Sequence, residues 1–223
     1  MSAVVDNLAM VRRRIESACA RVGRSAGSVE LIAVSKLHSA ASILECRAAG
    51  QLDFGENYAQ EMRDKAVELA AVGDLRWHAI GPLQLNKAKY VAKHADAFHA
   101  LDRADVAGEL SRRRSGKPLR CFIEINLASE ASKRGLEASR ASEFLDSVRQ
   151  LPGLEIVGLM CLPPMAARAD DSRPYFLKLK ELAAELKLPQ LSMGTTADFE
   201  VAIEEGSTAV RVGTAIFGER PSA

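Results

Sequence analysis

Strand-like and helix-like segments alternate along almost the entire chain. Short apolar stretches rich in β-branched residues are each followed by a longer amphipathic segment, with glycine or proline at most of the turns. About eight such units within 223 residues predict an α/β fold, a single (β/α)8 barrel of the TIM type. The predicted strands cover residues 29–36, 52–55, 75–80, 97–101, 119–127, 154–162, 191–194 and 208–213. An open doubly wound sheet is the alternative, and it fits less well because no GxGxxG motif follows the first strand.

An additional helix is expected before the first strand. Apolar residues recur there at steps of three and four, the spacing of an amphipathic helix, until Gly23 ends the pattern. These positions are Val4, Leu8, Val11, Ile15, Cys19 and Val22. The later helices are predicted over residues 39–49, 56–72, 84–94, 103–114, 137–151, 171–186 and 197–205. No shift in composition divides the chain, so we expect residues 1–223 to form a single barrel domain.

The overall composition excludes several classes of protein. Hydrophobic residues make up 48% of the chain and charged residues 26%, and the formal net charge is +1. That charge offers no electrostatic footprint for nucleic acid or an anionic membrane, and no apolar run approaches the ~20 residues of a membrane span. The scattered cysteines (Cys19, Cys46, Cys121 and Cys161) lie among apolar residues, which indicates buried thiols in a reducing compartment. With no secretory signal, we expect a cytoplasmic protein.

The first predicted strand ends in a lysine. Residues 29–34 are apolar apart from Glu30, which indicates a strand buried on both faces, and Lys36 stands just past them. The carboxyl end of a strand is where α/β barrels place their chemistry. Low-dielectric surroundings disfavour the ammonium form, and a neutral amine is the nucleophile that forms a Schiff base with an aldehyde. The alternative is that Lys36 only extends from the sheet into water.

Two glycine–hydroxyl clusters follow the last two predicted strands. They are Gly194-Thr195-Thr196 and Gly213-Thr214, at the place where barrels commonly bind phosphate. Glycines let backbone N–H groups approach an anion, and the hydroxyls donate to it. Each cluster alone also fits a turn with a helix N-cap, but together, opposite Lys36, they favour a phosphate site. The residue types do not choose between pyridoxal phosphate and the sugar phosphate of a class I aldolase.

Longer motifs resemble a known family. They are AVSK at residues 33–36, FGENY at 54–58, WHAIGPLQLNK at 77–87, GLM at 158–160, LSMG at 191–194 and RVGTAIFG at 211–218. The chain is similar in these stretches, and in their order, to the pyridoxal-phosphate homeostasis proteins. That resemblance implies a single barrel related to the amino-terminal domain of bacterial alanine racemase, with pyridoxal phosphate held as an internal aldimine.

The resemblance also implies roles for individual residues. Lys36 matches the aldimine lysine, Asn57 and Met193 match residues that line the cofactor ring, and Arg211 matches a residue near the ring. The phosphate end corresponds to Ser192, Thr196, Gly213 and Thr214. Relatives usually have a serine at the position of Thr196, which keeps the hydroxyl.

Two further positions concern lysines of the family. His38 stands where bacterial relatives commonly have a lysine, so any accessory amine role there is in doubt. Lys133 matches another lysine of the family, and we expect it to flank the phosphate from the loop at residues 128–135.

The family resemblance favours a binding protein without established turnover. Such a protein carries or buffers the cofactor and passes it to apo enzymes, and we expect a monomer. The alternative is an amino-acid racemase, which needs a base on each face of the substrate carbon. The chain ends at Ala223, so we expect the second domain that supplies a tyrosine in racemases to be absent. His78, His94 and His99 show no metal-ligand spacing, so no metal is expected.

Overall fold

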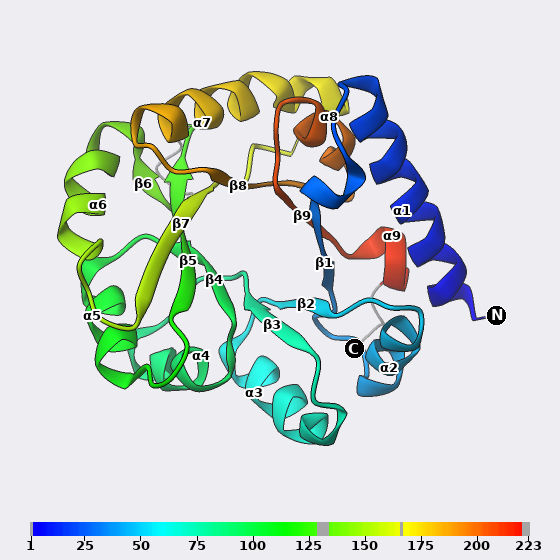
Figure 1. Cartoon of the computed structure of the whole chain (residues 1–223), viewed down its shortest axis with the longest axis horizontal. Coiled ribbons are helices and arrows are strands. Elements are labelled where there is room, and N and C mark those ends of the chain that lie inside the picture. The colour runs from blue at the N-terminus through cyan, green and yellow to red at the C-terminus, as the bar shows by residue number, and fades with distance from the viewer. Residues whose placement is uncertain (1, 129–133, 166, 220–223) are drawn as a thin grey trace.

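The computed structural model describes residues 2–128, 134–165 and 167–219, and parallel β-strands form its centre. The strands of the ring are β1 (Glu30–Val34), β2 (Asp53–Glu56), β3 (Arg76–Ala79), β4 (Ala97–Leu101), β5 (Leu119–Asn126), β7 (Leu154–Met160), β8 (Gln190–Thr195) and β9 (Ala209–Val212). Neighbours follow the order β4-β3-β2-β1-β9-β8-β7-β5, and β4 also pairs with β5. This last pairing closes the sheet into a barrel, as Figure 1 shows.

Helices connect the strands and cover the outside of the barrel (Figure 1). They are α1 (Ala3–Arg21), α2 (Ala40–Ala48), α3 (Ala59–Glu68), α4 (Ala88–His94), α5 (Ala104–Arg113), α6 (Ala141–Val148), α7 (Arg173–Glu185), α8 (Phe199–Glu204) and α9 (Thr214–Phe217). The prediction of a (β/α)8 barrel with an additional amino-terminal helix is therefore confirmed, and the open doubly wound sheet is excluded by the β4–β5 pairing.

The boundaries differ from the sequence prediction most clearly after β5. A two-residue strand, β6 (Leu136–Glu137), pairs with the end of β5, and a 3-10 turn over Ala138–Arg140 follows it. The helix predicted from residue 137 to 151 therefore begins only at Ala141 and ends at Val148. Pairing of so short a strand depends on β5 lying beside it, which no local pattern reveals.

The amino-terminal helix packs along one side of the barrel. Leu8, Val11 and Ile15 are buried, as their spacing predicts, and they join the main hydrophobic cluster. Figure 1 shows α1 beside α8 and α9, and Asn7 donates a hydrogen bond of 3.1 Å to the carbonyl oxygen of Ile216 in α9. All four cysteines are buried and unbridged.

Side chains alternate between the two faces of each strand, so one set points into the barrel and the other points toward the surrounding helices. Phe54 of β2 and Trp77 of β3 belong to the main hydrophobic cluster, which also includes helix residues. Their neighbours Asp53 and His78 hydrogen-bond each other instead, at 3.0 Å. The inside of the barrel therefore contains polar groups, while the layer between sheet and helices is apolar. None of the helices in the described part of the chain has both the length and the apolar character that a membrane span requires.

Candidate functional site

A cavity of about 600 Å³ opens where the barrel strands end. Segments that follow six of the strands form its wall, together with strand residues Val34 of β1, Glu124 of β5, Thr195 of β8 and Arg211 of β9. The described lining residues are Val34, Lys36, Asn57, Ile80, Gly81, Pro82, Glu124, Leu162, Met165, Thr195, Thr196, Ala197, Arg211, Gly213 and Thr214. This volume lies within the range of small-molecule sites, and the carboxyl ends of the strands are the functional end of a barrel.

Lys36 reaches this cavity from a tightly held loop. Its side chain is half-buried, and the next residue, Leu37, has a left-handed φ of 65°, which is uncommon for a residue other than glycine. The N–H group of Leu37 donates to Glu61 Oε1 at 2.6 Å, and Lys65 Nζ donates to the carbonyl oxygen of Ser35 at 2.7 Å. Hydrogen bonds from α3 thus fix the backbone on both sides of Lys36 and hold an otherwise unfavourable turn.

The groups that hold this loop form a buried ionic cluster. Lys65 Nζ lies 2.7 Å from Glu56 Oε1 and 2.8 Å from Glu61 Oε1, and the Ser35 hydroxyl donates to Glu56 at 2.7 Å. Burial raises the pKa of Glu56, although the Lys65 ammonium opposes that shift. Glu56 Oε2 has no hydrogen-bond partner among the described residues. The stability of the buried Glu56 carboxylate therefore depends strongly on its ion pair with Lys65.

The two glycine–hydroxyl clusters meet on the cavity wall. Gly194 has a φ of 93°, and an added Cβ would lie 2.6 Å from Ala202 Cβ, so a side chain would displace α8 from this turn. The N–H group of Gly213 donates to Thr196 Oγ1 at 3.3 Å, which ties the two turns together. Thr195 is held in turn by Asp198, which accepts hydrogen bonds from its N–H and hydroxyl groups.

Arg211 places a guanidinium group in the cavity wall and is 4% exposed. Its Nη1 donates to the Ser192 hydroxyl at 2.5 Å, and its Nη2 donates to the carbonyl oxygen of Cys161 at 3.0 Å. Burial lowers the pKa of Arg211, yet an arginine of this kind stays charged at neutral pH. These two contacts orient its planar group.

The structure brings together six of the eight residues predicted for the cofactor site. Lys36, Asn57, Thr196, Arg211, Gly213 and Thr214 all line the cavity. Ser192 and Met193 do not belong to the described lining, and both are fully buried.

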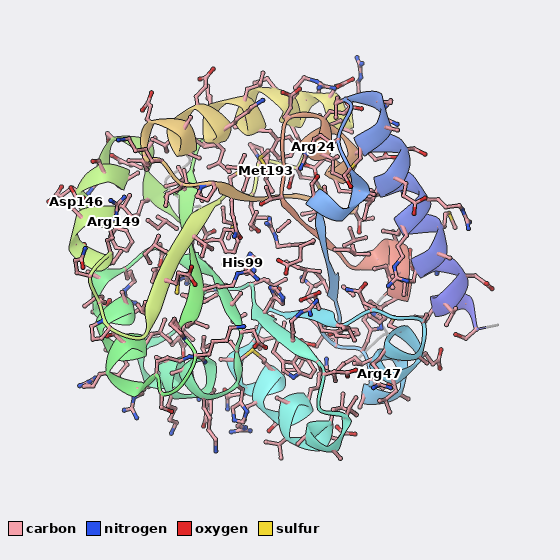
Figure 2. The ribbon with its side chains drawn as sticks, viewed as in Figure 1. Arg24, Arg47, His99, Asp146, Arg149 and Met193 are labelled. Carbon is pink, nitrogen blue, oxygen red and sulfur yellow. The ribbon has the colours of Figure 1, made fainter. Side chains whose placement is uncertain are left out.

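The two remaining residues lie behind the wall for different reasons. The Ser192 hydroxyl is occupied by Arg211 and by His99 Nδ1, at 2.8 Å. Met193 points the opposite way along the strand and packs in the second hydrophobic cluster, against the helices (Figure 2). Because successive side chains of a strand face opposite sides, Ser192 and Met193 cannot both face the cavity with their side chains.

Two other residues noted in the sequence lie apart from the cavity lining. The ring of His38 stacks on that of Phe217 in α9, with centroids 5.0 Å apart, so it joins the β1 loop to the carboxyl-terminal helix. Tyr58 is 62% exposed and lines a neighbouring pocket. Lys133 lies outside the described residues.

Glu124 is a cavity residue that the sequence analysis did not select. It is 7% exposed, and burial, together with the nearby charge of Asp102, raises its pKa to about 7. Arg211 and Arg134 oppose that shift. The sequence does contain an indication of this role, because Glu124 is a charged residue near the end of a strand whose neighbouring residues are mostly apolar.

Comparison with known proteins identifies the family of the chain. A family model described as the amino-terminal domain of alanine racemase matches residues 7–221. The pyridoxal phosphate homeostasis protein of Pseudomonas aeruginosa is 42% identical over 224 residues, which cover 99% of this chain and 97% of that protein. The chain belongs to the family of pyridoxal phosphate homeostasis proteins. The family member of Escherichia coli K12 is 41% identical, with 99% of this chain and 98% of that protein covered.

Solved structures extend the likeness to three dimensions. The structure of PipY from Synechococcus elongatus with pyridoxal phosphate bound has a TM-score of 0.85 and 36% identity, and covers 96% of this chain and 100% of that one. Alanine racemase from Corynebacterium glutamicum shares the fold, with a TM-score of 0.69 at 19% identity and 62% of its own chain covered. The resemblance seen in the sequence motifs is therefore confirmed at the level of family and fold.

The cavity fits the cofactor named in the family. A phosphate needs backbone and hydroxyl donors without side-chain obstruction, and the Gly194 and Gly213 turns provide them. An added Cβ at Gly213 would lie 3.3 Å from both the Cβ and the carbonyl oxygen of Val34, so the glycine also allows β1 to approach this turn. Lys36 lines the same cavity, as an aldehyde ligand requires.

Proposed function

We propose that this protein binds pyridoxal 5'-phosphate in the cavity at the carboxyl end of the barrel and holds it through Lys36. The observation that supports this most directly is the presence of one strand-end lysine and two linked glycine–threonine turns on one cavity wall. The family to which the chain belongs is named for the same cofactor. When bound, the cofactor supplies an aldehyde that reacts reversibly with an amine.

Different residues of the cavity bind different parts of the cofactor. Thr196, Gly213 and Thr214 hold the phosphate through hydroxyl and backbone donors, while Asn57 and Arg211 flank the ring. Lys36 provides the amine, and the α3 contacts keep its backbone in place. Ser192 acts on the cofactor only through Arg211.

We further propose that the protein carries and buffers the cofactor and has no turnover of its own. Within the described residues, no tyrosine lines the cavity, so the second base of a racemase is not supplied there. Leu162 and Met165 at the rim are 47% and 102% exposed, so the mouth is open to solvent and to acceptor proteins. An open site suits exchange of a cofactor better than stabilisation of a carbanion.

The wider expectations follow from the same properties. We propose a cytoplasmic monomer in which residues 1–223 form one cofactor-binding domain, and apo enzymes that use pyridoxal phosphate as its partners. With a net charge of +1, neither nucleic acid nor a membrane is expected to bind. No metal ion is expected in the cofactor cavity, since no described histidine or cysteine lines it.

Covalent attachment tests the binding role. The purified protein with pyridoxal phosphate should be yellow, and borohydride reduction followed by peptide mapping should place the label on Lys36. Lys36→Ala should abolish both signals, whereas Lys178→Ala, an exposed lysine of α7, should retain them. Labelling of a different lysine in the wild-type protein would refute the assignment.

The phosphate end is tested by comparing two ligands. Thr214→Ala should weaken retention of pyridoxal phosphate by about 10–100-fold, because a hydrogen bond to a charged group contributes roughly 1.5–3 kcal/mol. Retention of pyridoxal, which lacks the phosphate, should change little. Equal losses for both ligands would place the phosphate elsewhere.

The racemase alternative requires its own assay. Conversion of L-alanine to D-alanine should be undetectable at high concentrations of the loaded wild-type protein. Robust turnover that disappears in Lys36→Ala would favour the racemase over the carrier.

A further inference from the structure

A continuous series of hydrogen-bonded side chains crosses the interior of the barrel. Asp53 Oδ1, at the start of β2, lies 3.0 Å from His78 Nε2. His78 Nδ1 lies 3.0 Å from His99 Nε2 in β4, and His99 Nδ1 lies 2.8 Å from the Ser192 hydroxyl in β8. Ser192 accepts from Arg211, which lines the cofactor cavity. We call the members Asp53, His78, His99, Ser192 and Arg211 the interior relay.

The interior relay is shielded from water along its length. His99 and Ser192 are fully buried, His78 is 1% exposed, and Asp53 and Arg211 are 6% and 4% exposed. Figure 2 shows His99 inside the ring of strands. Its ring also stacks on Phe122, with centroids 4.4 Å apart. In such surroundings each hydrogen bond is strong, and an unmade one is costly.

The chemistry of the two ends fixes the directions of the two outermost hydrogen bonds, with Asp53 as the acceptor at one end and Arg211 as the donor at the other. Burial favours a raised pKa for Asp53, but hydrogen bonds from Arg76 and His78 outweigh it and lower the pKa to about 2. Asp53 is therefore an ionised carboxylate, and His78 must donate to it from Nε2. Burial lowers the pKa of His99 well below its usual value, so that ring is neutral.

If His78 carries a single proton, only one arrangement of protons from Asp53 onward satisfies each bond. His78, protonated on Nε2, accepts at Nδ1 from His99 Nε2, which leaves His99 Nδ1 as an acceptor for the Ser192 hydroxyl proton. Ser192 then offers its lone pairs to Arg211, an obligatory donor. All donors point from the cofactor cavity toward Asp53.

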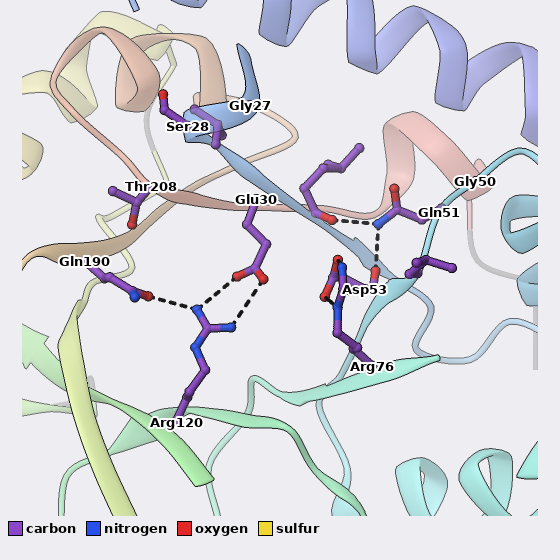
Figure 3. A pocket seen from close by; sticks show the side chains of 13 residues that line it. Gly27, Ser28, Glu30, Gly50, Gln51, Asp53, Arg76, Arg120, Gln190 and Thr208 are labelled. Atoms are coloured by element: carbon purple, nitrogen blue, oxygen red, sulfur yellow. Dashed lines mark hydrogen bonds and ion pairs between the residues drawn. The ribbon is translucent and has the colours of Figure 1, made fainter. Parts of the chain in front are cut away.

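The far end of the interior relay lies in a second pocket, at the amino ends of the strands. This pocket has a volume of about 530 Å³, and Figure 3 shows Arg76 on Asp53 and Arg120 between Glu30 and Gln190. Possible ligand atoms of Glu30, Asp53 and His78 lie within 4.8 Å of one another, as in a metal site. Both carboxylates are already paired with arginines, so we assign this end to hydrogen bonding.

We propose that Asp53, His78, His99 and Ser192 are positioning residues that hold the Arg211 guanidinium in the cofactor cavity from the opposite end of the barrel. Ser192 alone could accept from Arg211 in several orientations. When the Ser192 hydroxyl donates its hydrogen bond to His99, the lone pairs of Ser192 face Arg211. The carboxylate of Asp53 keeps both histidines in the tautomer that leaves His99 Nδ1 free to accept from Ser192. The effect on the cofactor rests on the proposed function, whereas the proton arrangement does not.

The proton arrangement can be measured on the intact protein without cofactor. Nitrogen-15 NMR of histidine-labelled protein should show His78 and His99 as neutral rings protonated on Nε2, with assignments from His78→Gln and His99→Gln. A proton on Nδ1 of either ring, or a doubly protonated ring, would overturn the proposal whatever the cofactor assays show.

A matched pair of variants tests the long-range effect. Asp53→Asn and Glu30→Gln each neutralise an arginine-paired carboxylate of the same pocket, but only Asp53 belongs to the interior relay. We expect Asp53→Asn to weaken retention of pyridoxal phosphate by about threefold to thirtyfold and to alter the absorbance spectrum of the bound cofactor. Glu30→Gln should leave both unchanged. Equal effects of the two variants would refute the proposal.

A double-mutant cycle separates positioning from general loss of stability. Ser192→Ala interrupts the interior relay beside Arg211, so adding Asp53→Asn should cause no further loss of cofactor retention, whereas Ser192→Thr should restore the wild-type value. Losses that multiply in the double variant would show that Asp53 acts through folding alone. If Lys36 is not labelled in the wild-type protein, the proposed function fails, and the NMR result still decides the proton arrangement.

Discussion

Glu124 shows how one side chain can serve the cavity at a cost to stability. Its pKa is raised from 4.5 to about 7 by burial and by Asp102, so the folded protein disfavours the carboxylate that the unfolded chain readily forms. The folded state binds the extra proton between these two values, and stability from this group is present at low pH and lost as pH rises through about 7. Functional sites commonly retain such unfavourable groups.

Glu124→Gln should therefore stabilise the protein without cofactor at pH 8 by up to about 3 kcal/mol, and by less than about 1 kcal/mol at pH 5. The amide imitates the protonated acid and has no charge to bury. Urea unfolding at the two pH values measures the difference. Glu185→Gln, at an exposed site on α7, is the control and should stay within about 0.5 kcal/mol at both. A stabilisation that does not depend on pH would contradict the assigned shift.

At the scale of elements, α3 acts as a support for the loop that follows β1. Lys65 extends from α3 to the Ser35 carbonyl, and Glu61 of the same helix accepts from the Leu37 N–H group. Hydrogen bonds from α3 thus hold the backbone in place immediately before and after Lys36. A sequence pattern shows α3 as an amphipathic helix but not that one of its lysines is buried against another strand's loop.

Lys65→Met should lower the free energy of unfolding by about 3–5 kcal/mol, because Glu56 would remain as a buried charge without its cation. The freed loop should also slow covalent attachment of pyridoxal phosphate to Lys36. Urea unfolding and the rate of the absorbance change on adding cofactor measure the two effects. Lys89→Met, an exposed lysine of α4, should change neither. If a folded Lys65→Met protein attached the cofactor at the wild-type rate, α3 would not be needed to position Lys36.

At the scale of the whole molecule, α1 packs against helices from both the first and the last strand–helix units of the barrel. It contacts α2, α8 and α9, and Arg24, just after it, donates to the carbonyl oxygens of Ile203 and Ser207. Arg14 pairs with Glu200 at 3.0 Å. The helix therefore connects the first and last strand–helix units of the barrel, beside the turn that carries Gly213 and Thr214.

Leu8→Ala should destabilise the protein by about 2–5 kcal/mol, since the side chain is fully buried and its removal leaves a cavity. Met10→Ala, on the same helix but 48% exposed, should change the free energy of unfolding by less than about 0.5 kcal/mol. Thermal and urea unfolding measure both. Similar losses for the two variants would mean that α1 is not seated as described.

The sequence alone determined the barrel, the added helix and the carboxyl-end position of Lys36, Gly213 and Thr214. Those features follow from local periodicity and from the rule that parallel strands end on one side, so they need no knowledge of which strands are neighbours. Family motifs supplied the roles of Asn57 and Arg211, whereas Thr196 stood out already as part of a glycine–hydroxyl cluster.

Only the tertiary structure decided which polar side chains inside the barrel meet. His78 and His99 look like isolated histidines in the sequence, and Ser192 like part of a phosphate loop, yet barrel closure brings them into one series with Asp53 and Arg211. These contacts join strands up to 93 residues apart. Such pairings depend on strand order, register and the face to which each side chain points, and a shift of one residue would turn every one of them toward the helices.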